Sequence, residues 1–108
     1  MIAHIVLFRP RADLTDEARD ALAGAFEAAL HQIPTIRRAC VGRRVLHGRA
    51  YETLMREDYQ YAAVIEFDDL AGLTAYLQHP SHEHLASRFF AAFEQALIYD
   101  FELKDSTQ

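Results

Sequence analysis

The sequence predicts a single α+β domain in which four strands form one antiparallel sheet and the helices cover one face of that sheet. Short segments rich in β-branched and aromatic residues read as strands, and two longer segments carry apolar residues at helical spacing. These segments follow one another in the order β-α-β-β-α-β, which is the order of a ferredoxin-like fold. At 108 residues the chain has the length of one domain. We expect residues 1–103 to form this domain and residues 104–108 to be a disordered tail.

Four segments have the composition and alternation of strands: residues 2–8, 36–46, 59–67 and 97–103. In the first strand His4 shares one face with three apolar residues, Ile2, Val6 and Phe8. Gly42 interrupts the second strand and predicts a bulge or a close backbone approach there. The third strand presents one continuous apolar face: Tyr59, Tyr61, Ala63, Ile65 and Phe67. Between the second and third strands, residues 48–57 read as a loop with a short helical turn at residues 52–55.

Thr15 can cap a first helix, and Pro34 ends it. The residues expected to face the core are Ala18, Leu22, Phe26, Ala29, Leu30 and Ile33. Asp68 or Asp69 can cap a second helix with Leu70, Leu73 and Leu77 on its inner side. This helix must stop at His79-Pro80, because proline disfavours helical backbone in the residue before it. Ser81 is then expected to cap a further helix with four inward residues: Leu85, Phe89, Phe93 and Ala96.

The strands at residues 2–8 and 59–67 are apolar on both faces, although the helices of this fold cover only one face. An apolar sheet face of this size is not expected to stay in contact with water. We therefore predict a homodimer in which two sheets meet face to face and form a dimeric α/β-barrel.

The composition argues against several classes of partner. Sixteen acidic and eleven basic residues give a formal charge of -5, so a nucleic-acid partner would depend on two arginine pairs alone, Arg37-Arg38 and Arg43-Arg44. We expect no nucleic-acid binding. Cys40, the single cysteine, excludes an internal disulfide and is expected to be a small buried group in its strand. No segment approaches the length of a membrane span, and we expect a cytoplasmic protein with no membrane partner.

The segment Tyr76-Leu77-Gln78-His79-Pro80-Ser81-His82 gathers titratable side chains beside the helix break. His82 precedes Leu85 by three residues and therefore faces the sheet. With Tyr76, His4 and Tyr61 it would line one cavity between sheet and helices, whose apolar walls we assign to Phe26, Ala63, Phe89 and Phe93. Histidine can act as a general base near pH 7, and a tyrosine hydroxyl can donate to a carbonyl oxygen that gains negative charge. The pair Tyr76 and His82 is thus the predicted catalytic pair for enolisation or aldol-type closure without a cofactor.

Other interpretations of this segment remain open. A Tyr or His at a helix break can simply be a cap or a half-buried packing group, and we assign such a structural role to His79 with Pro80. A metal site built from His79, His82 and His84 is not expected, because His82 and His84 point to different sides of one helix and the break separates His79 from both.

The segment 76–82, together with His4 before Ile5-Val6-Leu7-Phe8, Ile33-Pro34 and the ending Ile98-Tyr99-Asp100-Phe101, resembles the stress-responsive dimeric α/β-barrel (Dabb) family. The resemblance implies the same dimeric ferredoxin-like barrel. One branch of the family closes linear polyketides without a cofactor, with a tyrosine and a histidine that match Tyr76 and His82 and with His4 in support. This chain departs from that branch in having Tyr61 where a third pocket histidine is expected and a longer loop at residues 48–58. A non-catalytic stress-response or assembly protein and a cofactor-independent monooxygenase are the alternative functions.

Overall fold

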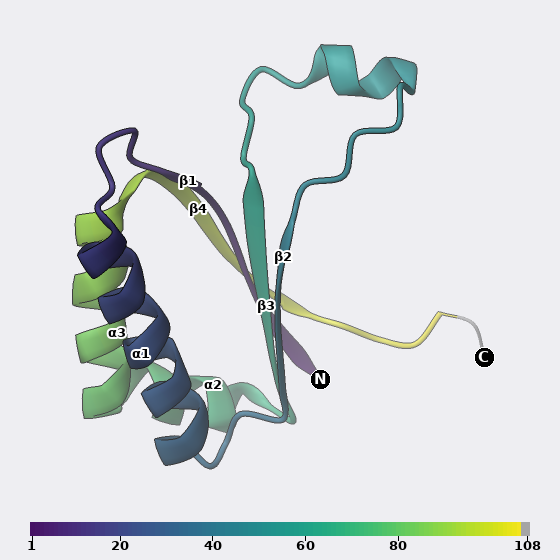
Figure 1. The fold of residues 1–108 in the computed structure, drawn as a ribbon. Helices are drawn as coiled ribbons and strands as arrows, with labels where there is room; N and C mark the ends of the chain where they lie inside the picture. The colour runs from purple at the N-terminus through teal and green to yellow at the C-terminus, as the bar shows by residue number, and fades with distance from the viewer. Residues whose placement is uncertain (107–108) are drawn as a thin grey trace.

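The computed structural model describes residues 1–106 as one sheet with a layer of helices on one side (Figure 1). The elements are, in order, β1 (Ile2–Pro10), α1 (Asp16–Gln32), β2 (Arg38–Arg43), η1 (Ala50–Leu54), β3 (Tyr61–Phe67), α2 (Leu70–Gln78), α3 (Pro80–Ala92) and β4 (Phe93–Glu102). The predicted β-α-β-β-α-β order and the ferredoxin-like fold are confirmed, with the second helical segment divided into α2 and α3. Residues 103–106 carry no helix or strand, and the last two residues of the predicted tail lie outside the described residues.

The sheet is antiparallel throughout and has the strand order β2-β3-β1-β4. β1 is central, and His4 lies opposite Ile65 on one side and Asp100 on the other. Gly42 pairs in register with Ala62, and no atom lies within 4 Å of the position where its Cβ would stand. The predicted bulge or close approach at Gly42 is therefore wrong for this chain.

β4 begins at Phe93, so the prediction that Phe93 and Ala96 lie on a helix is wrong. The strand starts early because its first residues pair with the end of β1: Ala96 lies opposite Phe8, and Gln95 lies opposite Arg9 and accepts a hydrogen bond from it. This non-local pairing overrides the local helical preference of the segment.

Side-chain caps set the helix starts. Thr15 accepts a hydrogen bond from the Ala18 amide at 3.1 Å, as predicted, and Asp69 accepts one from the Gly72 amide at 2.8 Å. α2 and α3 are separated at His79-Pro80, which confirms the predicted break. The cap of α3, however, is His79 instead of Ser81: the His79 Nδ1 atom accepts from the Ser81 amide at 3.0 Å. Proline is favoured at the first helical position because it lacks an amide hydrogen, so α3 begins at Pro80 and its cap lies two residues before the predicted one.

α1 turns the predicted side to the core, whereas α2 differs from the prediction. In α1 and its C-cap, Ala29 and Ile33 are buried, and Leu22 and Phe26 pack against the same cluster. Leu30 is the exception, because it is exposed and Ala25 is buried instead. α2 buries Gly72, Leu73 and Tyr76, whereas Leu70 and Leu77 are exposed. Gly72 lies at ordinary packing distance from Phe67 and Thr35, since an added Cβ would lie 3.5 Å and 3.6 Å from them. The Thr35 hydroxyl also donates a hydrogen bond to the Gly72 carbonyl at 2.9 Å, which holds this side of α2 inward.

The two faces of the sheet differ in what covers them. Buried residues of the helix-facing side form two clusters, one around Phe67 and Tyr76 and one around Phe8. On the opposite side, which we call the open face, no described element covers Ile5, Val64 or Tyr99 (Figure 1). Cys40 lies exposed on the open face, so its predicted burial is wrong for the single chain. Among the described residues, no helix is both long enough and apolar enough to span a membrane.

Candidate functional site

The helix break brings Tyr76 and His82 together. Tyr76 lies in the last turn of α2, and His82 lies in the first turn of α3. Their ring centroids are 4.6 Å apart, and the rings meet edge to face at 62°. Tyr76 is only 2% exposed, whereas His82 is half-buried. In a continuous helix residues six apart would lie on different sides, so the break at His79 makes this contact possible.

Two residues of the sheet extend this pair into a row of polar side chains. The His4 ring lies 5.7 Å from the Tyr76 ring, again edge to face. The His4 Nδ1 atom lies 2.6 Å from Asp100 Oδ1, across the β1–β4 pairing. A carboxylate can only accept, so Nδ1 carries the proton and donates it in this hydrogen bond. We call Asp100, His4, Tyr76 and His82 the polar row; it runs from β4 across β1 and α2 to α3.

The surroundings of the row move two pKa values in opposite directions. Burial, with the negative charge of Asp100, raises the pKa of Tyr76 to about 12, so its hydroxyl stays protonated at neutral pH. Burial, with the nearby His4, lowers the pKa of His82, while the Leu77 backbone and Glu83 oppose this shift. At neutral pH the row therefore presents an uncharged imidazole beside a protonated phenol.

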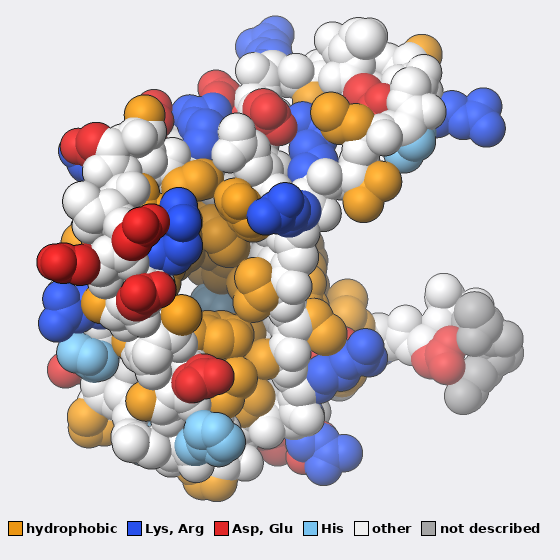
Figure 2. All heavy atoms as spheres, viewed as in Figure 1, with side chains coloured by type: hydrophobic (Ala, Val, Ile, Leu, Met, Phe, Trp, Pro, Cys, Tyr) orange, Lys and Arg blue, Asp and Glu red, His pale blue; other side chains and the backbone are white. Residues whose placement is uncertain are grey.

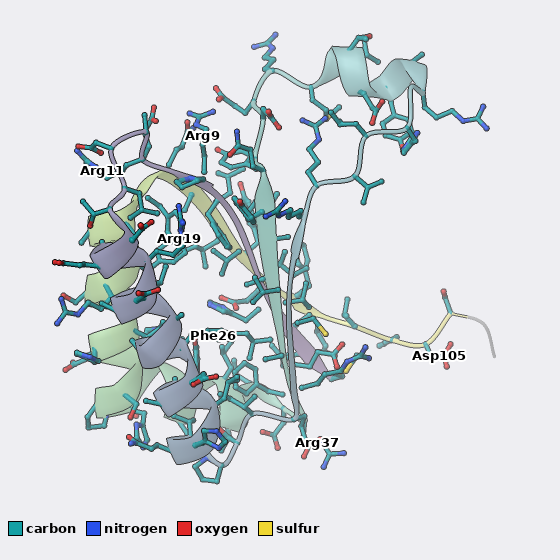
Figure 3. All side chains as sticks on the ribbon, in the orientation of Figure 1. Arg9, Arg11, Arg19, Phe26, Arg37 and Asp105 are labelled. Carbon is teal, nitrogen blue, oxygen red and sulfur yellow. The ribbon has the colours of Figure 1, made fainter. Side chains whose placement is uncertain are left out.

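A hollow opens between the helices and the sheet. α1 packs mainly against α3, and its backbone approaches the strands at few points. Figure 2 shows the hollow from one side, lined largely by hydrophobic side chains with a histidine visible at its floor. Phe26 lies on the side of α1 that faces the sheet and packs against the cluster containing Tyr76 (Figure 3).

The structure does not bring Tyr61 to the polar row. Tyr61 stacks on Phe8 with ring centroids 5.6 Å apart. It lies opposite Phe8 in the sheet, four residues along β1 from His4, which corresponds to about 13 Å. Of the four polar rings expected in one place, three lie together and Tyr61 lies apart.

The predicted apolar wall residues lie mostly with Tyr61. Ala63, Phe89 and Phe93 belong to the cluster around Phe8, where the Phe8 ring lies 5.4 Å from Phe89 and 4.5 Å from Phe93. We call this set, with Val6 and Ala96, the phenylalanine cluster. Phe26 is the one predicted wall residue that packs against the Tyr76 side.

Asp100 is the residue of the site that the sequence prediction missed. Strand alternation places Asp100 on the same face as Ile98 and Ala96, opposite His4, Val6 and Phe8. The signal that could have identified Asp100 is a single carboxylate at a strand position that faces the helices, next to a histidine.

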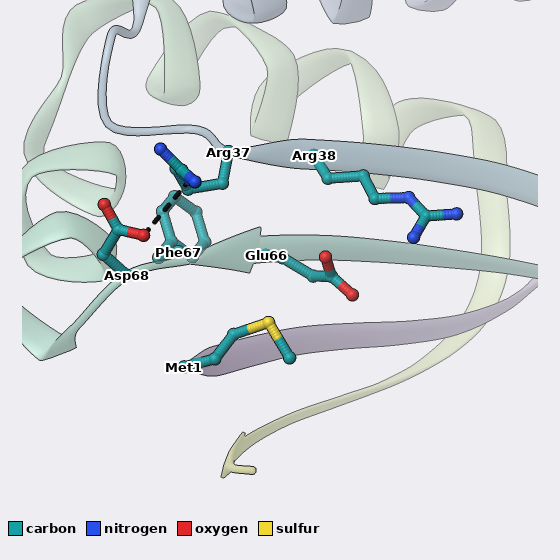
Figure 4. Close-up of a pocket in the computed structure, with 6 residues that line it drawn as sticks. All are labelled: Met1, Arg37, Arg38, Glu66, Phe67 and Asp68. Atoms are coloured by element: carbon teal, nitrogen blue, oxygen red, sulfur yellow. Dashed lines mark ion pairs between the residues drawn. The ribbon is translucent and has the colours of Figure 1, made fainter. Parts of the chain in front are cut away.

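Two further depressions lie on the surface away from the polar row. One, of about 420 Å³, is lined by Met1, Arg37, Arg38, Glu66, Phe67 and Asp68 (Figure 4). The other, of about 230 Å³, is lined by Arg43, Arg44, Leu46, Asp58, Gln60 and Tyr61. Each contains an arginine paired with an acid: Arg37 Nε lies 3.1 Å from Asp68, and Arg44 Nη1 lies 2.7 Å from Asp58. Within residues 1–106, no three His, Cys, Asp or Glu side chains are arranged to hold a metal ion.

Several solved structures share this fold. The protein At3g17210 from Arabidopsis thaliana superposes with a TM-score of 0.81 at 16% identity, over 100% of both chains. A hydroxynitrile lyase from Passiflora edulis has a TM-score of 0.79 at 20% identity, over 99% of this chain and 96% of that one. A dimeric protein of unknown function with a ferredoxin-like fold, from Bacteroides fragilis, has a TM-score of 0.65 at 27% identity, over 94% and 95%. No curated protein matches the sequence. A family model for the stress responsive A/B barrel domain matches residues 2–103.

Proposed function

The chain belongs to the stress-responsive A/B barrel (Dabb) domain family, and we propose that it is a homodimer that binds a small apolar carbonyl compound between sheet and helices. In this proposal Tyr76 and His82 transfer a proton next to the carbonyl group, and no cofactor takes part. The observation that carries the proposal is the contact between a phenol kept protonated and an imidazole kept uncharged, 4.6 Å apart between ring centroids. These are the states that an acid–base pair needs at neutral pH.

The proposed reaction begins with the carbonyl oxygen of the ligand accepting a hydrogen bond from the Tyr76 hydroxyl. His82 then takes a proton from the carbon next to the carbonyl, and the electron pair of that C–H bond moves to form an enolate. Tyr76 stabilises the negative charge that develops on the oxygen. The enolate is consumed either by return of the proton, which gives isomerisation, or by attack on a second carbonyl carbon, which closes a ring.

The position of His82 supports its role as the base. His82 lies in the first turn of α3, where its ring meets Tyr76 and the Leu77 backbone partly offsets the lowering of its pKa. A neutral imidazole has one nitrogen that carries no proton and can accept one. The helix break therefore supplies the approach of Tyr76 to His82.

The apolar part of the ligand would lie toward Phe26 and the phenylalanine cluster. Phe26 of α1, Phe89 of α3 and Phe93 of β4 are only partly buried, so part of each ring is accessible to a ligand. The presence of a hydroxynitrile lyase among proteins of this fold supports chemistry at a carbonyl carbon, although at 20% identity the likeness concerns the fold alone.

Exchange of the α-hydrogens of phenylacetone for deuterium in D2O, followed by NMR, tests the proposed proton transfer. We expect the protein to speed this exchange well above an imidazole buffer of equal concentration. His82→Gln should lower the rate by about 10²-fold or more, the usual contribution of a general base. His84→Gln is the matched control, because His84 lies on the same helix and is exposed. Equal rates for His82→Gln and wild type would contradict the proposal.

The homodimer is supported by the apolar open face and by the dimeric proteins among the similar structures. Light scattering after size exclusion measures its mass directly. A mass of 12.3 kDa at micromolar concentration would rule the homodimer out.

A non-catalytic stress-response or assembly role is the second candidate, and one observation favours it. The Tyr76 ring also packs against Phe67, a fully buried residue of the core, with ring centroids 5.2 Å apart, so the ring has a structural use apart from chemistry. Phenylacetone exchange no faster than in buffer, together with a loss of stability in Tyr76→Ala, would favour this role.

A further inference from the structure

The segment between β2 and β3 is an arm that projects from the body of the protein. We define the arm as residues 44–60, which contain η1 and lie beyond the end of the sheet (Figure 1). The radius of gyration of the chain is 15.0 Å, whereas a compact chain of this length is expected to have about 13 Å. The chain is therefore more extended than a compact domain, and η1 shares few backbone contacts with any other helix or strand.

The arm has an internal structure of its own. Glu52 accepts hydrogen bonds from the backbone amides of His47 and Gly48, at 3.0 and 2.7 Å. The Tyr51 hydroxyl lies 2.6 Å from His47 Nε2, and Gly48 adopts the positive φ of 83° that the turn requires. These contacts within the arm give it a defined shape.

Two ion pairs hold the base of the arm, one within the arm itself and one to the sheet. Arg44 joins Asp58 across the two ends of the arm at 2.7 Å. Glu57 lies 3.3 Å from Arg9 near the end of β1. The direction of the arm is thus held by the same sheet that carries the open face.

The arm exposes apolar side chains that have no cover in the single chain. Val45 is 76% exposed and Leu54 is 73% exposed. Leu46, Tyr51 and Met55 are also exposed. Surface loops are usually polar, and apolar groups gathered in this way indicate a contact with another molecule.

The position of the arm indicates where the molecule that it contacts would lie. In Figure 1 the arm leans away from the helices, toward the side of the open face, and residues 103–106 leave the sheet on that side too. A body seated on the open face would therefore lie beside the arm. The open face exposes three large apolar residues of β4, Leu97, Tyr99 and Phe101.

The surface area agrees with a partner of the same size. The chain exposes 7787 Å², whereas a compact monomer of this mass exposes about 6,100 Å². The excess is roughly 1,700 Å², and a stable interface covers about 800 Å² on each partner. The open face and the arm together supply enough surplus surface for a homodimer that uses both.

We propose that the arm of each copy closes over the other copy of the chain in the homodimer and buries Val45, Leu46, Leu54 and Met55 against it. The inference rests on the homodimer of the proposed function and adds a second contact to the sheet-to-sheet interface. Under two-fold symmetry the contact occurs twice, since each arm reaches the partner. The longer loop of this chain then has a function in assembly and none in the chemistry of the polar row.

Sedimentation of dilution series tests the arm with two kinds of variant. Val45→Asp combined with Leu54→Asp should raise the dimer dissociation constant at least 100-fold, because a charge would be placed in an apolar contact on both arms. Leu70→Asp is the matched control: Leu70 is 65% exposed on a helix and lies on neither surface. Its dissociation constant should stay within threefold of wild type. Circular dichroism establishes that each variant is folded.

Tyr99→Asp on the open face separates the failure of this inference from the failure of the homodimer. If Tyr99→Asp dissociates the dimer and the arm variant does not, the arm contact is wrong and the homodimer stands. If wild type is monomeric, both are wrong. Hydrogen exchange of residues 44–60 gives a second readout: protection should fall when the protein is diluted below the dissociation constant. Protection that does not depend on concentration would mean that the arm packs on its own chain, and would overturn the inference.

Discussion

The helix-facing side of the sheet has two halves, in which the same strands carry side chains with different roles. In one half the side chains of His4 and Asp100 join Tyr76 and His82 in the polar row. In the other half Phe8 packs with Tyr61, Phe89 and Phe93, and the contacts are between aromatic rings. The two halves share β1, so His4 and Phe8 differ only in their position along one strand.

The two halves differ mainly in whether their buried side chains can gain or lose a proton. In the polar row, burial and one carboxylate act on groups that can gain or lose a proton, so their pKa values move. In the phenylalanine cluster the same burial acts on hydrocarbon and yields only packing energy. Substitutions in the polar row should therefore change mainly the exchange rate, and substitutions in the phenylalanine cluster should change mainly the stability. The predictions test this difference.

The largest expected effect is on stability, in the phenylalanine cluster. Phe8→Ala should lower the free energy of unfolding by about 3–5 kcal/mol, because it removes a buried ring in contact with three others. Urea denaturation measures this change. Phenylacetone exchange per folded molecule should fall less than in His82→Gln, because Phe8 belongs to the apolar wall of the proposed site and not to the acid–base pair.

Phe90→Ala is the control for that substitution. Phe90 is a phenylalanine next to Phe89 in α3 but is exposed, so its removal should cost about 1 kcal/mol or less. Similar losses for Phe8→Ala and Phe90→Ala would show that Phe8 is not a core residue.

The next effect is on rate, in the polar row. Tyr76→Phe should slow phenylacetone exchange by about 10²-fold, the usual cost of losing a donor to a developing oxyanion. Its free energy of unfolding should change by about 1 kcal/mol or less, because the ring that packs against Phe67 is kept. Exchange kinetics and urea denaturation of the same preparation provide both numbers. A large loss of stability with an unchanged rate would instead assign Tyr76 to packing.

The sequence predicted the parts of this arrangement that depend on local signals. Thr15, the pair His79-Pro80 and the alternation in β1 and β3 act within a few residues, so strands, helix break and element order could be read directly. The position of Tyr61 could not, because its distance from His4 depends on the register of β1 against β3. The inner side of α2 depends on the contact of Gly72 with Phe67 and Thr35, and the start of β4 depends on pairing with Arg9. These are non-local contacts.

A smaller effect should appear as a dependence on pH. The pKa of His82 is lowered in the folded state, mainly by burial, so the unfolded chain binds more protons as the pH falls below the ordinary value of about 6.5. Stability should be fully present above that value and should decline as the pH falls toward the lowered pKa. The exchange rate of the folded protein should decline at a lower pH, as the pH passes through the lowered pKa of His82 and the protonated imidazole stops acting as a base.

His82→Gln provides the comparison for the pH dependence, because glutamine does not titrate. Urea midpoints of wild type and variant at pH 7.5 and 5.5 isolate the contribution of His82 from those of the other histidines. The wild-type midpoint should fall more than that of the variant. An equal fall would mean that His82 is not desolvated in the folded protein.

The smallest expected effect comes from Asp100→Asn, which keeps an acceptor for His4 Nδ1 and removes the negative charge. Burial is the larger cause of the raised Tyr76 pKa and Asp100 is the lesser one, so the substitution should lower that pKa only part of the way toward its ordinary value. Ultraviolet titration of tyrosinate, taken as the difference from Tyr76→Phe, isolates this residue from the other tyrosines. Stability should change by about 1 kcal/mol or less, because a hydrogen bond to His4 is retained. Asp13→Asn serves as the control, since Asp13 is exposed and pairs with Arg11 away from the row. A Tyr76 pKa unaffected by Asp100→Asn would mean that the carboxylate acts on His4 alone, and the polar row would then end at β1.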